Sequence, residues 1–254
     1  NNLLKEIGRI HTYEEFLNTY SLARKVGFNN INADLIIGLP KQTIADVENS
    51  VNELVNLKLE HISVYSLILE EGTMLEELVR SGKLKLPEDK EERNMYWKVK
   101  NILEKNGYNH YEISNFAKHG SESKHNLDCW KQKEYVGFGV AAHSYTNGVR
   151  YSNIENIEEY IKNYEEGKEE DNFVFHEKQT HNMKVKEYMM LGLRKIEGVC
   201  IQEFKEKFAA NPIFVFKTEL EKLVNEELLE VNGDYIKLTN KGLDLANLVW
   251  EEFV

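Results

Sequence analysis

The chain contains little cysteine: Cys129 and Cys200 are its only two among 254 residues. Neither belongs to a C-x-x-C or C-x-x-x-C pattern. An iron–sulfur cluster needs several thiolates brought together, so this chain does not supply the ligands of a cluster by itself. Isolated cysteines without a secretory signal are typical of a reducing compartment, and we expect a cytoplasmic protein.

Long apolar runs and excess positive charge are also missing. No segment approaches the roughly 20 apolar residues of a membrane-spanning helix. The 43 acidic residues outnumber the 32 basic ones and give a net charge of −11. This balance disfavours general affinity for nucleic acid. The length allows two domains, or one domain and part of another.

The N-terminal part alternates between helical and strand patterns. Thr12-x-x-Glu15 and Thr43-x-x-Asp46 are capping boxes, which predict helices over residues 13–26 and 44–57. Short apolar runs at residues 31–37 and 61–69 predict strands. This alternation predicts parallel β-α units. Two strands do not make a stable sheet, so a larger sheet or barrel is expected.

Asp34 lies inside the first of these apolar runs, INADLII. We expect this strand to be buried on both faces, where an unpaired carboxylate is destabilising. One explanation is a salt bridge or a hydrogen-bonded strand end. The other is a ligand site, because parallel barrels place ligand chemistry where a strand passes into a helix. The Gly38-Leu39-Pro40 break that follows favours such a junction.

The middle of the chain is the most polar. A helix is predicted from Glu88 to Lys105, and residues 108–116 alternate as a strand with His110 and Glu112 on one face. A polar loop then leads to His125-Asn126-Leu127-Asp128-Cys129-Trp130. Residues 135–145 predict a strand whose small side chains leave space for a ligand, with His143 near its end.

The histidines have different interpretations. His125, beside Asn126 and Trp130, is either a hydrogen-bonded loop anchor or part of a polar ligand site. Five other histidines are interpreted as surface or helix-end residues: His11, His61, His119, His176 and His181.

The composition changes after about Asn156. Residues 158–171 contain seven acidic side chains, which indicates a helix followed by a solvated connector. Helices are predicted over 179–195, 201–208 and 213–230, then a hairpin at Asn232-Gly233 and a last helix over 241–253. This order is winged-helix-like.

Two other functional classes fit parts of these patterns. A winged helix could bind nucleic acid, but the helix after residue 213 carries only Lys217 and Lys222 against five glutamates. Phosphate contacts need the opposite sign, so we expect no nucleic-acid partner. A barrel hydrolase using Asp34 and Glu112 as acid and base is the second alternative.

Several segments, taken in order, carry a family resemblance: NNLLKEIGRIHTYEEF, INADLIIGLPKQT, HISVYSLILEEGT, YEISNFAKHG, HNLDCW, EYVGFGVAAHSY and the ending LTNKGLDLANLVWEEF. Together they resemble the radical S-adenosylmethionine haem chaperones of the HemW type, relatives of oxygen-independent coproporphyrinogen III oxidase. Members of that family begin with a C-x-x-x-C-x-x-C cluster loop, which this chain lacks. The resemblance therefore implies the C-terminal part of a longer protein.

The resemblance implies an α/β fold in three regions. Residues 1–155 would be the C-terminal part of a partial TIM-like radical S-adenosylmethionine barrel with its extension. Residues 156–175 would be an acidic helix and connector, and residues 176–254 a HemN-type, winged-helix-like C-terminal domain.

The resemblance also implies a function for the full-length protein. It would bind haem and pass it to a haem-dependent apoprotein, using S-adenosylmethionine and a 4Fe–4S cluster. The alternative is the oxidase branch, which decarboxylates two propionates of coproporphyrinogen III. Because the cluster motif is missing, we expect no radical chemistry from this chain alone.

Site residues follow from the same resemblance. Arg9 would contact the carboxylate end of S-adenosylmethionine, Asp34 a polar group of it, and Ile68 its adenine. His125, Asn126 and Trp130 would form the haem region. The family pattern there is H-N-x-x-Y-W, and Cys129 replaces its tyrosine. His143 stands where the oxidase branch has an apolar residue near the cofactor.

Overall fold

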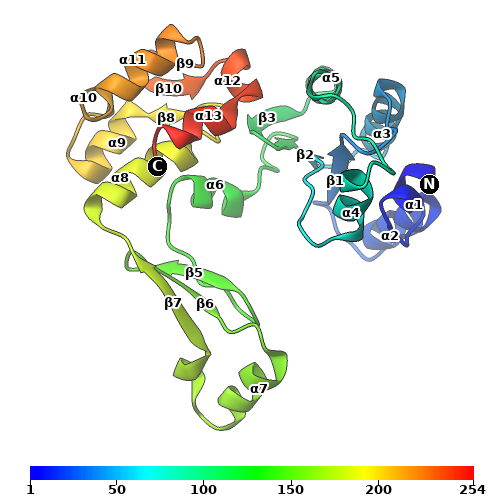
Figure 1. Cartoon of the computed structure of the whole chain (residues 1–254), viewed down its shortest axis with the longest axis horizontal. Helices are drawn as coiled ribbons and strands as arrows, with labels where there is room; N and C mark the ends of the chain where they lie inside the picture. Colours follow the sequence, from blue (N-terminus) through cyan, green and yellow to red (C-terminus); the bar gives the residue numbers. More distant parts are fainter. The chain divides into compact units, whose positions relative to one another are not determined.

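The structure is a computed structural model that describes residues 1–254. The chain forms two compact units, Asn1–Glu122 and Ser123–Val254, which run from blue to green and from green to red in Figure 1. The predicted region boundaries after residues 155 and 175 both fall within the second unit.

The first unit is a four-stranded mixed sheet with helices. Its elements are α1 (Asn2–Glu6), α2 (Tyr13–Lys25), β1 (Asn32–Ile37), α3 (Ile44–Asn56), β2 (His61–Ser66), α4 (Met74–Arg80), α5 (Asp89–Lys105), β3 (Asn109–Glu112) and β4 (Asn115–Ala117). The strand order is β1-β2-β4-β3. β1 and β2 are parallel, as predicted, and β4 is antiparallel to both of its neighbours.

The predicted helix starts are confirmed. Thr12 and Glu15 form a capping box at the start of α2, and Thr43 and Asp46 form one at the start of α3. In each, the threonine hydroxyl accepts a hydrogen bond from a backbone N–H that has no partner within the helix.

The prediction that β1 is buried on both faces is wrong. Alternate side chains of β1, namely Ala33, Leu35 and Ile37, enter a core that α3 and α5 cover. The opposite face carries Asn32 and Asp34, and both are exposed. The prediction failed because Ile36 is apolar although it lies on the open face, where it is only partly buried. Leu35, Ile36 and Ile37 therefore form a continuous apolar run in the sequence.

The predicted strand over 108–116 is a hairpin instead. β3 and β4 pair antiparallel, with a bulge between His110 and Glu112. The bulge adds one residue and changes the alternation, so His110 and Glu112 do not share a face as predicted. The His110 ring stacks on Phe116 at a centroid distance of 4.4 Å, whereas Glu112 accepts a hydrogen bond from the Asn115 amide.

The second unit contains two antiparallel three-stranded sheets. Its elements are α6 (Lys124–Trp130), β5 (His143–Thr146), β6 (Val149–Asn153), α7 (Ile157–Glu165), η1 (Glu169–Asn172), β7 (Phe173–Lys178), α8 (His181–Gly192), β8 (Val199–Cys200), α9 (Ile201–Phe208), α10 (Pro212–Val215), α11 (Lys217–Asn225), β9 (Leu229–Asn232), β10 (Tyr235–Leu238), α12 (Asn240–Asp244) and α13 (Ala246–Glu251).

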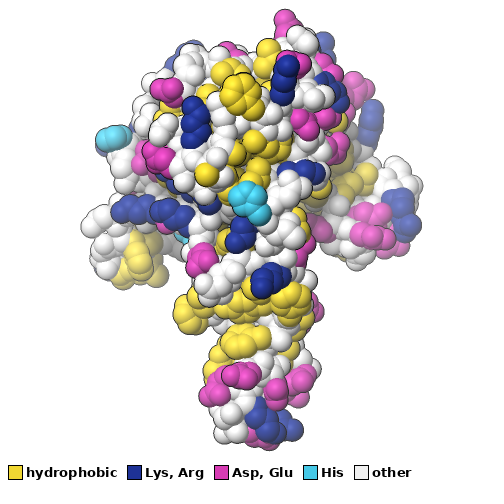
Figure 2. Space-filling model, turned by 90° about the vertical axis from the view of Figure 1, so that its left-hand side faces the viewer, with side chains coloured by type: hydrophobic (Ala, Val, Ile, Leu, Met, Phe, Trp, Pro, Cys, Tyr) yellow, Lys and Arg dark blue, Asp and Glu magenta, His cyan; other side chains and the backbone are white.

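The sheet β5-β6-β7 was not predicted. Only the end of the expected strand over 135–145 is a strand, and Tyr135 joins Tyr145 through an isolated bridge. The turn Asn147-Gly148 has φ values of 52° and 71°, the conformation that Asn-Gly favours in hairpins. This dipeptide was the sequence signal for the β5–β6 hairpin. Figure 2 shows hydrophobic side chains along this part of the chain and charged ones at its tip.

The C-terminal sheet has the order β8-β10-β9, and the predicted hairpin around Asn232-Gly233 is confirmed. Two predicted helices are each divided in two. The first is interrupted at Phe216 and the second at Leu245, where the backbone leaves helical geometry. Phe216 is buried and packs against the Phe253 ring at 5.2 Å. No helix in the chain is both long and apolar enough to cross a membrane.

Candidate functional site

The open face of the sheet in the first unit carries a row of polar side chains. We define the polar sheet face as Asn32 and Asp34 of β1, His61 and Ser63 of β2, and Tyr111 of β3. Asn32 is paired in register with His61, and Asp34 with Ser63. Alternation along parallel strands puts these side chains on the side opposite the apolar core.

Hydrogen bonds connect the polar sheet face. His61 Nδ1 lies 2.7 Å from Asn32 Oδ1, and His61 Nε2 lies 2.8 Å from the Tyr111 hydroxyl. Ser63 Oγ donates to Asn32 Oδ1 at 3.1 Å. Asn32 Nδ2 donates to Asp34 Oδ1 at 2.7 Å. Asp34 therefore has a hydrogen-bonded neighbour on its own strand.

The interpretation of His61 as a surface residue is wrong, since it is only 7% exposed. Burial lowers its pKa below the usual value, and the nearby carboxylates of Asp34 and Glu122 oppose that shift only in part. Sequence reasoning missed His61 because neither of its hydrogen-bond partners is near it in the sequence. Its polar neighbours come from β1 and β3, which are distant in the chain.

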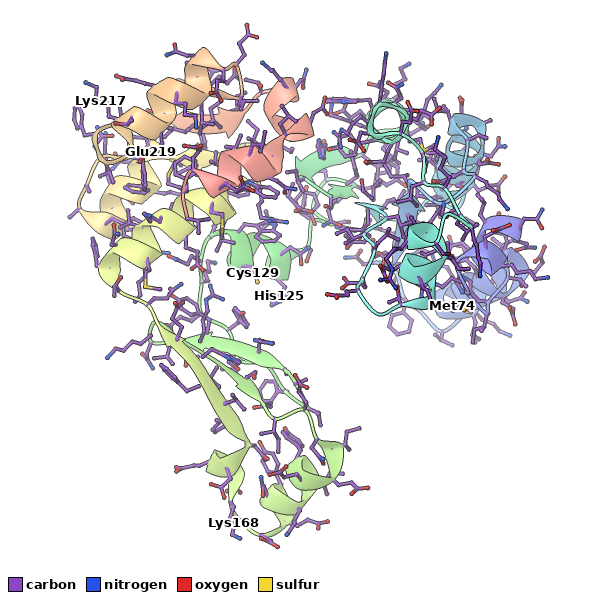
Figure 3. The ribbon with its side chains drawn as sticks, viewed as in Figure 1. Met74, His125, Cys129, Lys168, Lys217 and Glu219 are labelled. Atoms are coloured by element: carbon purple, nitrogen blue, oxygen red, sulfur yellow. The ribbon has the colours of Figure 1, made fainter.

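Arg9 lies in an exposed turn directly after α1. Gly8 precedes it with a φ of 73°. A Cβ added to Gly8 would stand 3.8 Å from the methyl group of Met74 at the start of α4, which Figure 3 labels. Lys41, just beyond the end of β1, makes a 2.8 Å salt bridge with Glu6 of α1. The Arg9 turn is thus tied to the segment that follows β1.

Ile68 follows the end of β2 and is 76% exposed. β1 and β2 end at the same level, because Leu67 N donates to Ile37 O at 2.9 Å. Arg9, Asp34 and Ile68 all belong to the first unit. The guanidinium of Arg9 suits a carboxylate. The carboxylate of Asp34 suits a hydroxyl or ammonium donor, and the aliphatic chain of Ile68 suits a flat apolar ring. These three types of side chain match the carboxylate, the polar groups and the adenine of S-adenosylmethionine.

His125 stands on α6, a short helix, where the sequence predicted a loop. The Ser123 hydroxyl caps this helix by accepting from Asn126 N. His125 is exposed, and its Nε2 lies 3.7 Å from Cys129 Sγ one turn later. Figure 3 shows the two side chains extending from α6. Burial and the Asp128 carboxylate raise the pKa of the Cys129 thiol, which therefore stays protonated at neutral pH.

Trp130, at the end of α6, makes a cation–π contact with Arg194. The Arg194 guanidinium lies 4.7 Å from the Trp130 ring centre and 4.2 Å from that of Trp250. Such contacts add to the packing of an aromatic side chain. One face of Trp130 is thereby occupied, so its indole anchors α6 to the C-terminal helices of the same unit.

His143, at the start of β5, belongs to the second unit. Its ring stacks on that of His176 at 5.3 Å, and His176 Nε2 is 2.8 Å from Ser152 Oγ. The proposed S-adenosylmethionine residues and the proposed haem residues therefore divide between the two units, and His143 belongs to the same unit as His125, Asn126 and Trp130.

The two alternative site types receive little support. Glu112 is only 1% exposed and is hydrogen-bonded to Asn115, so a substrate does not reach it as an acid or base. On α11, where Figure 3 labels Lys217 and Glu219, Lys217 pairs with Glu221 at 3.8 Å. Lys222 pairs with Glu252 at 2.5 Å. Both lysines are thus already near acids.

The described residues do not fit an iron–sulfur cluster. Both cysteines are free, and no group of three or more histidine, cysteine or acidic side chains is arranged to hold a metal ion. A 4Fe–4S cluster needs about four such ligands.

Comparison with known proteins decides the family. Residues 179–245 match the family model described as the HemN C-terminal domain. Over the whole chain, the sequence is 40% identical to the heme chaperone HemW of Lactococcus lactis subsp. lactis and 38% identical to that of Bacillus subtilis. The chain belongs to the HemW family. It spans 66% of the length of each of these relatives.

The fold agrees with this family. A solved structure titled as coproporphyrinogen III oxidase (HemN) from Escherichia coli, a radical SAM enzyme, matches 99% of this chain with a TM-score of 0.78 and 18% identity. The chain covers 61% of that protein. The predicted fold class, an α/β radical S-adenosylmethionine type followed by a HemN C-terminal domain, is confirmed for this HemW family member.

Proposed function

We propose that this chain is the part of a cytoplasmic haem chaperone that supplies a haem site on α6 and half of an S-adenosylmethionine site in the first unit. Haem would pass from it to a haem-dependent apoprotein. One observation carries the proposal. Alignments that cover the whole chain show 38–40% sequence identity to proteins named heme chaperones.

The chemistry of α6 supports the haem assignment. His125 is an exposed imidazole, and a neutral imidazole is a common axial ligand of haem iron. The capping hydroxyl of Ser123 and the cation-covered Trp130 fix the two ends of the helix that carries it. Cys129 replaces the tyrosine of the family pattern, and its raised pKa disfavours a thiolate ligand.

The open side of the first unit supports the cofactor assignment. Arg9 would bind the carboxylate of S-adenosylmethionine, Asp34 would accept a hydrogen bond from it, and Ile68 would pack on its base. When bound beside a reduced cluster, this cofactor supplies a radical. The chain's own residues bind and orient it, and the cluster ligands would have to come from elsewhere.

A haem titration tests the haem assignment. Haem is added to the purified chain and followed by its Soret absorbance. We expect His125→Ala to weaken binding at least about tenfold, since an iron–imidazole bond is lost. The control is His119→Ala, which removes another exposed histidine outside α6.

Cys129→Tyr tests the departure from the family pattern in the same titration. Tighter binding would mean that the phenol contributes to the site and the natural cysteine weakens it. Unchanged binding would mean that this position only packs. Equal affinities for the wild type, His125→Ala and His119→Ala would refute the haem site on α6.

A further inference from the structure

The orientation of the Asn32 amide is set by a charge. Asn32 lies 2.7 Å from the Asp34 carboxylate, and only its Nδ2 group can donate a hydrogen bond there. The opposite orientation would place two acceptor oxygens at that distance. Asn32 Oδ1 therefore faces β2, where it accepts from Ser63 Oγ at 3.1 Å.

The same orientation fixes the tautomer of His61. Because Asn32 Oδ1 is an acceptor, the His61 nitrogen 2.7 Å away, Nδ1, must carry the proton. In the neutral ring, Nε2 is then an acceptor. The Tyr111 hydroxyl, 2.8 Å from Nε2, donates to it. The protons thus point in one direction, from Tyr111 through His61 and Asn32 to Asp34.

Burial keeps this arrangement in its neutral form. Ser63 is 2% exposed and His61 is 7% exposed, and burial lowers the pKa of His61. A protonated imidazole would have no lone pair for the Tyr111 proton. Hydrogen bonds in such buried chains polarise one another, so each strengthens the next.

The chain of hydrogen bonds ends at an exposed group. Asp34 Oδ1 receives the Asn32 proton, and Asp34 is exposed. The two partners of His61 come from β1 and β3, and the line of donors ends at a carboxylate on the open face.

We propose that Asn32, His61 and Tyr111 are positioning residues, which hold Asp34 Oδ1 so that Asp34 Oδ2 is presented to a hydrogen-bond donor of the bound ligand. The inference rests on the proposed S-adenosylmethionine site and names what orients its acidic residue. A carboxylate held in one rotamer loses less side-chain entropy on binding, so pre-organisation favours affinity.

Nuclear magnetic resonance of the ¹⁵N-labelled chain without cofactor tests the proposal. Imidazole ¹⁵N shifts report the tautomer of His61, and side-chain ¹⁵N relaxation reports the mobility of Asn32. In the wild type we expect the Nδ1–H tautomer and an Asn32 order parameter of about 0.8. In His61→Phe, which keeps the ring volume, we expect that order parameter to fall below about 0.6.

Three further variants separate positioning from packing. His61→Asn keeps a donor near the Nδ1 position, and we expect it to restore part of the lost Asn32 order. Tyr111→Phe removes only the hydroxyl, and we expect the Nδ1–H tautomer to persist, because Asn32 Oδ1 still accepts from Nδ1. Tyr65→Phe is the matched control, because it removes a tyrosine hydroxyl from the same face of β2, at a residue that is 42% exposed.

Either of two results would overturn the proposal: an Nε2–H tautomer in the wild type, or unchanged Asn32 order in His61→Phe. If His61→Phe does not fold, the tautomer in the wild type and in Tyr111→Phe decides. S-adenosylmethionine affinity of the wild type is measured separately by calorimetry. Because this chain supplies only half of the proposed site, that affinity bears on the cofactor assignment and leaves the hydrogen-bond result intact.

Discussion

At the scale of single residues, His110 is a buried imidazole in an apolar setting. It is stacked on Phe116, and its Nε2 lies 3.2 Å from the Tyr96 hydroxyl. Burial lowers its pKa to about 4, whereas an exposed histidine titrates near 6.5. The unfolded chain therefore binds more protons than the folded chain in this range, so stability falls as the pH drops.

We expect the contribution of His110 to be fully present above about pH 6.5 and lost progressively as the pH falls towards about 4. Between about pH 7 and pH 5 the loss should be about 2 kcal/mol of unfolding free energy. Urea unfolding at both pH values measures it. His110→Gln should show a smaller pH dependence. An identical slope in both proteins would mean that His110 does not titrate as its burial requires.

At the scale of elements, a capping box begins α3, the helix that packs on the apolar face of β1. Thr43 accepts from Asp46 N, and Asp46 accepts from Thr43 N. The hydrogen bonds from Thr43 lower the pKa of Asp46, so this contribution is present at neutral pH and is lost as the pH falls through the lowered pKa.

We expect Thr43→Ala to lower the unfolding free energy by about 1 kcal/mol at neutral pH. The helix loses one capping acceptor and Asp46 loses its hydroxyl donor. Urea unfolding measures the change, and Thr43→Ser, which keeps the hydroxyl, should stay near the wild type. A Thr43→Ser loss equal to that of Thr43→Ala would mean that the methyl group, not the cap, matters.

The C-terminal sheet has a close backbone approach at Gly198. This glycine has a φ of 85°, and an added Cβ would lie 2.2 Å from Ile236 O on β10. The residue leads directly into β8, whose Val199 pairs with Ile236. Gly233, in the β9–β10 turn, has a φ of 59° with nothing within 4 Å of an added Cβ.

We expect Gly198→Ala to lower the unfolding free energy by about 3 kcal/mol, because a clash adds to the left-handed backbone strain. Gly233→Ala, which meets only the strain, should lower it by about 1 kcal/mol. Thermal unfolding by circular dichroism compares the two. Equal losses would show that β8 can shift to accept the methyl group.

At the scale of the whole molecule, the second unit has an apolar core of its own. Large side chains such as Phe204, Met189 and Leu223 are almost completely buried within it. In the first unit, β1 is an edge strand with a hydrogen-bonded neighbour on one side only. An unpaired strand edge is open to association with another strand.

We therefore expect residues 123–254 to fold when produced alone. The expected result is a single cooperative thermal transition by circular dichroism, unchanged by a tenfold change in protein concentration of about 10 to 100 µM. Residues 1–122 are the comparison, and their open β1 edge should make their transition depend on concentration. A gradual, non-cooperative melt of residues 123–254 would contradict the independence of its core.

Local patterns in the sequence determined the elements that depend on a few consecutive residues. The capping boxes at Thr12 and Thr43 and the Asn232-Gly233 hairpin required no distant contact, because their hydrogen bonds close within one turn. The ordered motifs, read as a resemblance, determined the family. Asp34 and His125 were identified at this level, and their assignment to ligand sites stays a prediction.

Only the tertiary structure decided what covers each residue. Asp34 is open to solvent because α3 and α5 pack on the other face of β1, and His61 is buried because Asn32 and Tyr111 meet it from other strands. Trp130 faces Arg194, which lies far along the chain. Burial and hydrogen-bond direction depend on neighbours brought together from distant segments, and local periodicity carries no record of them.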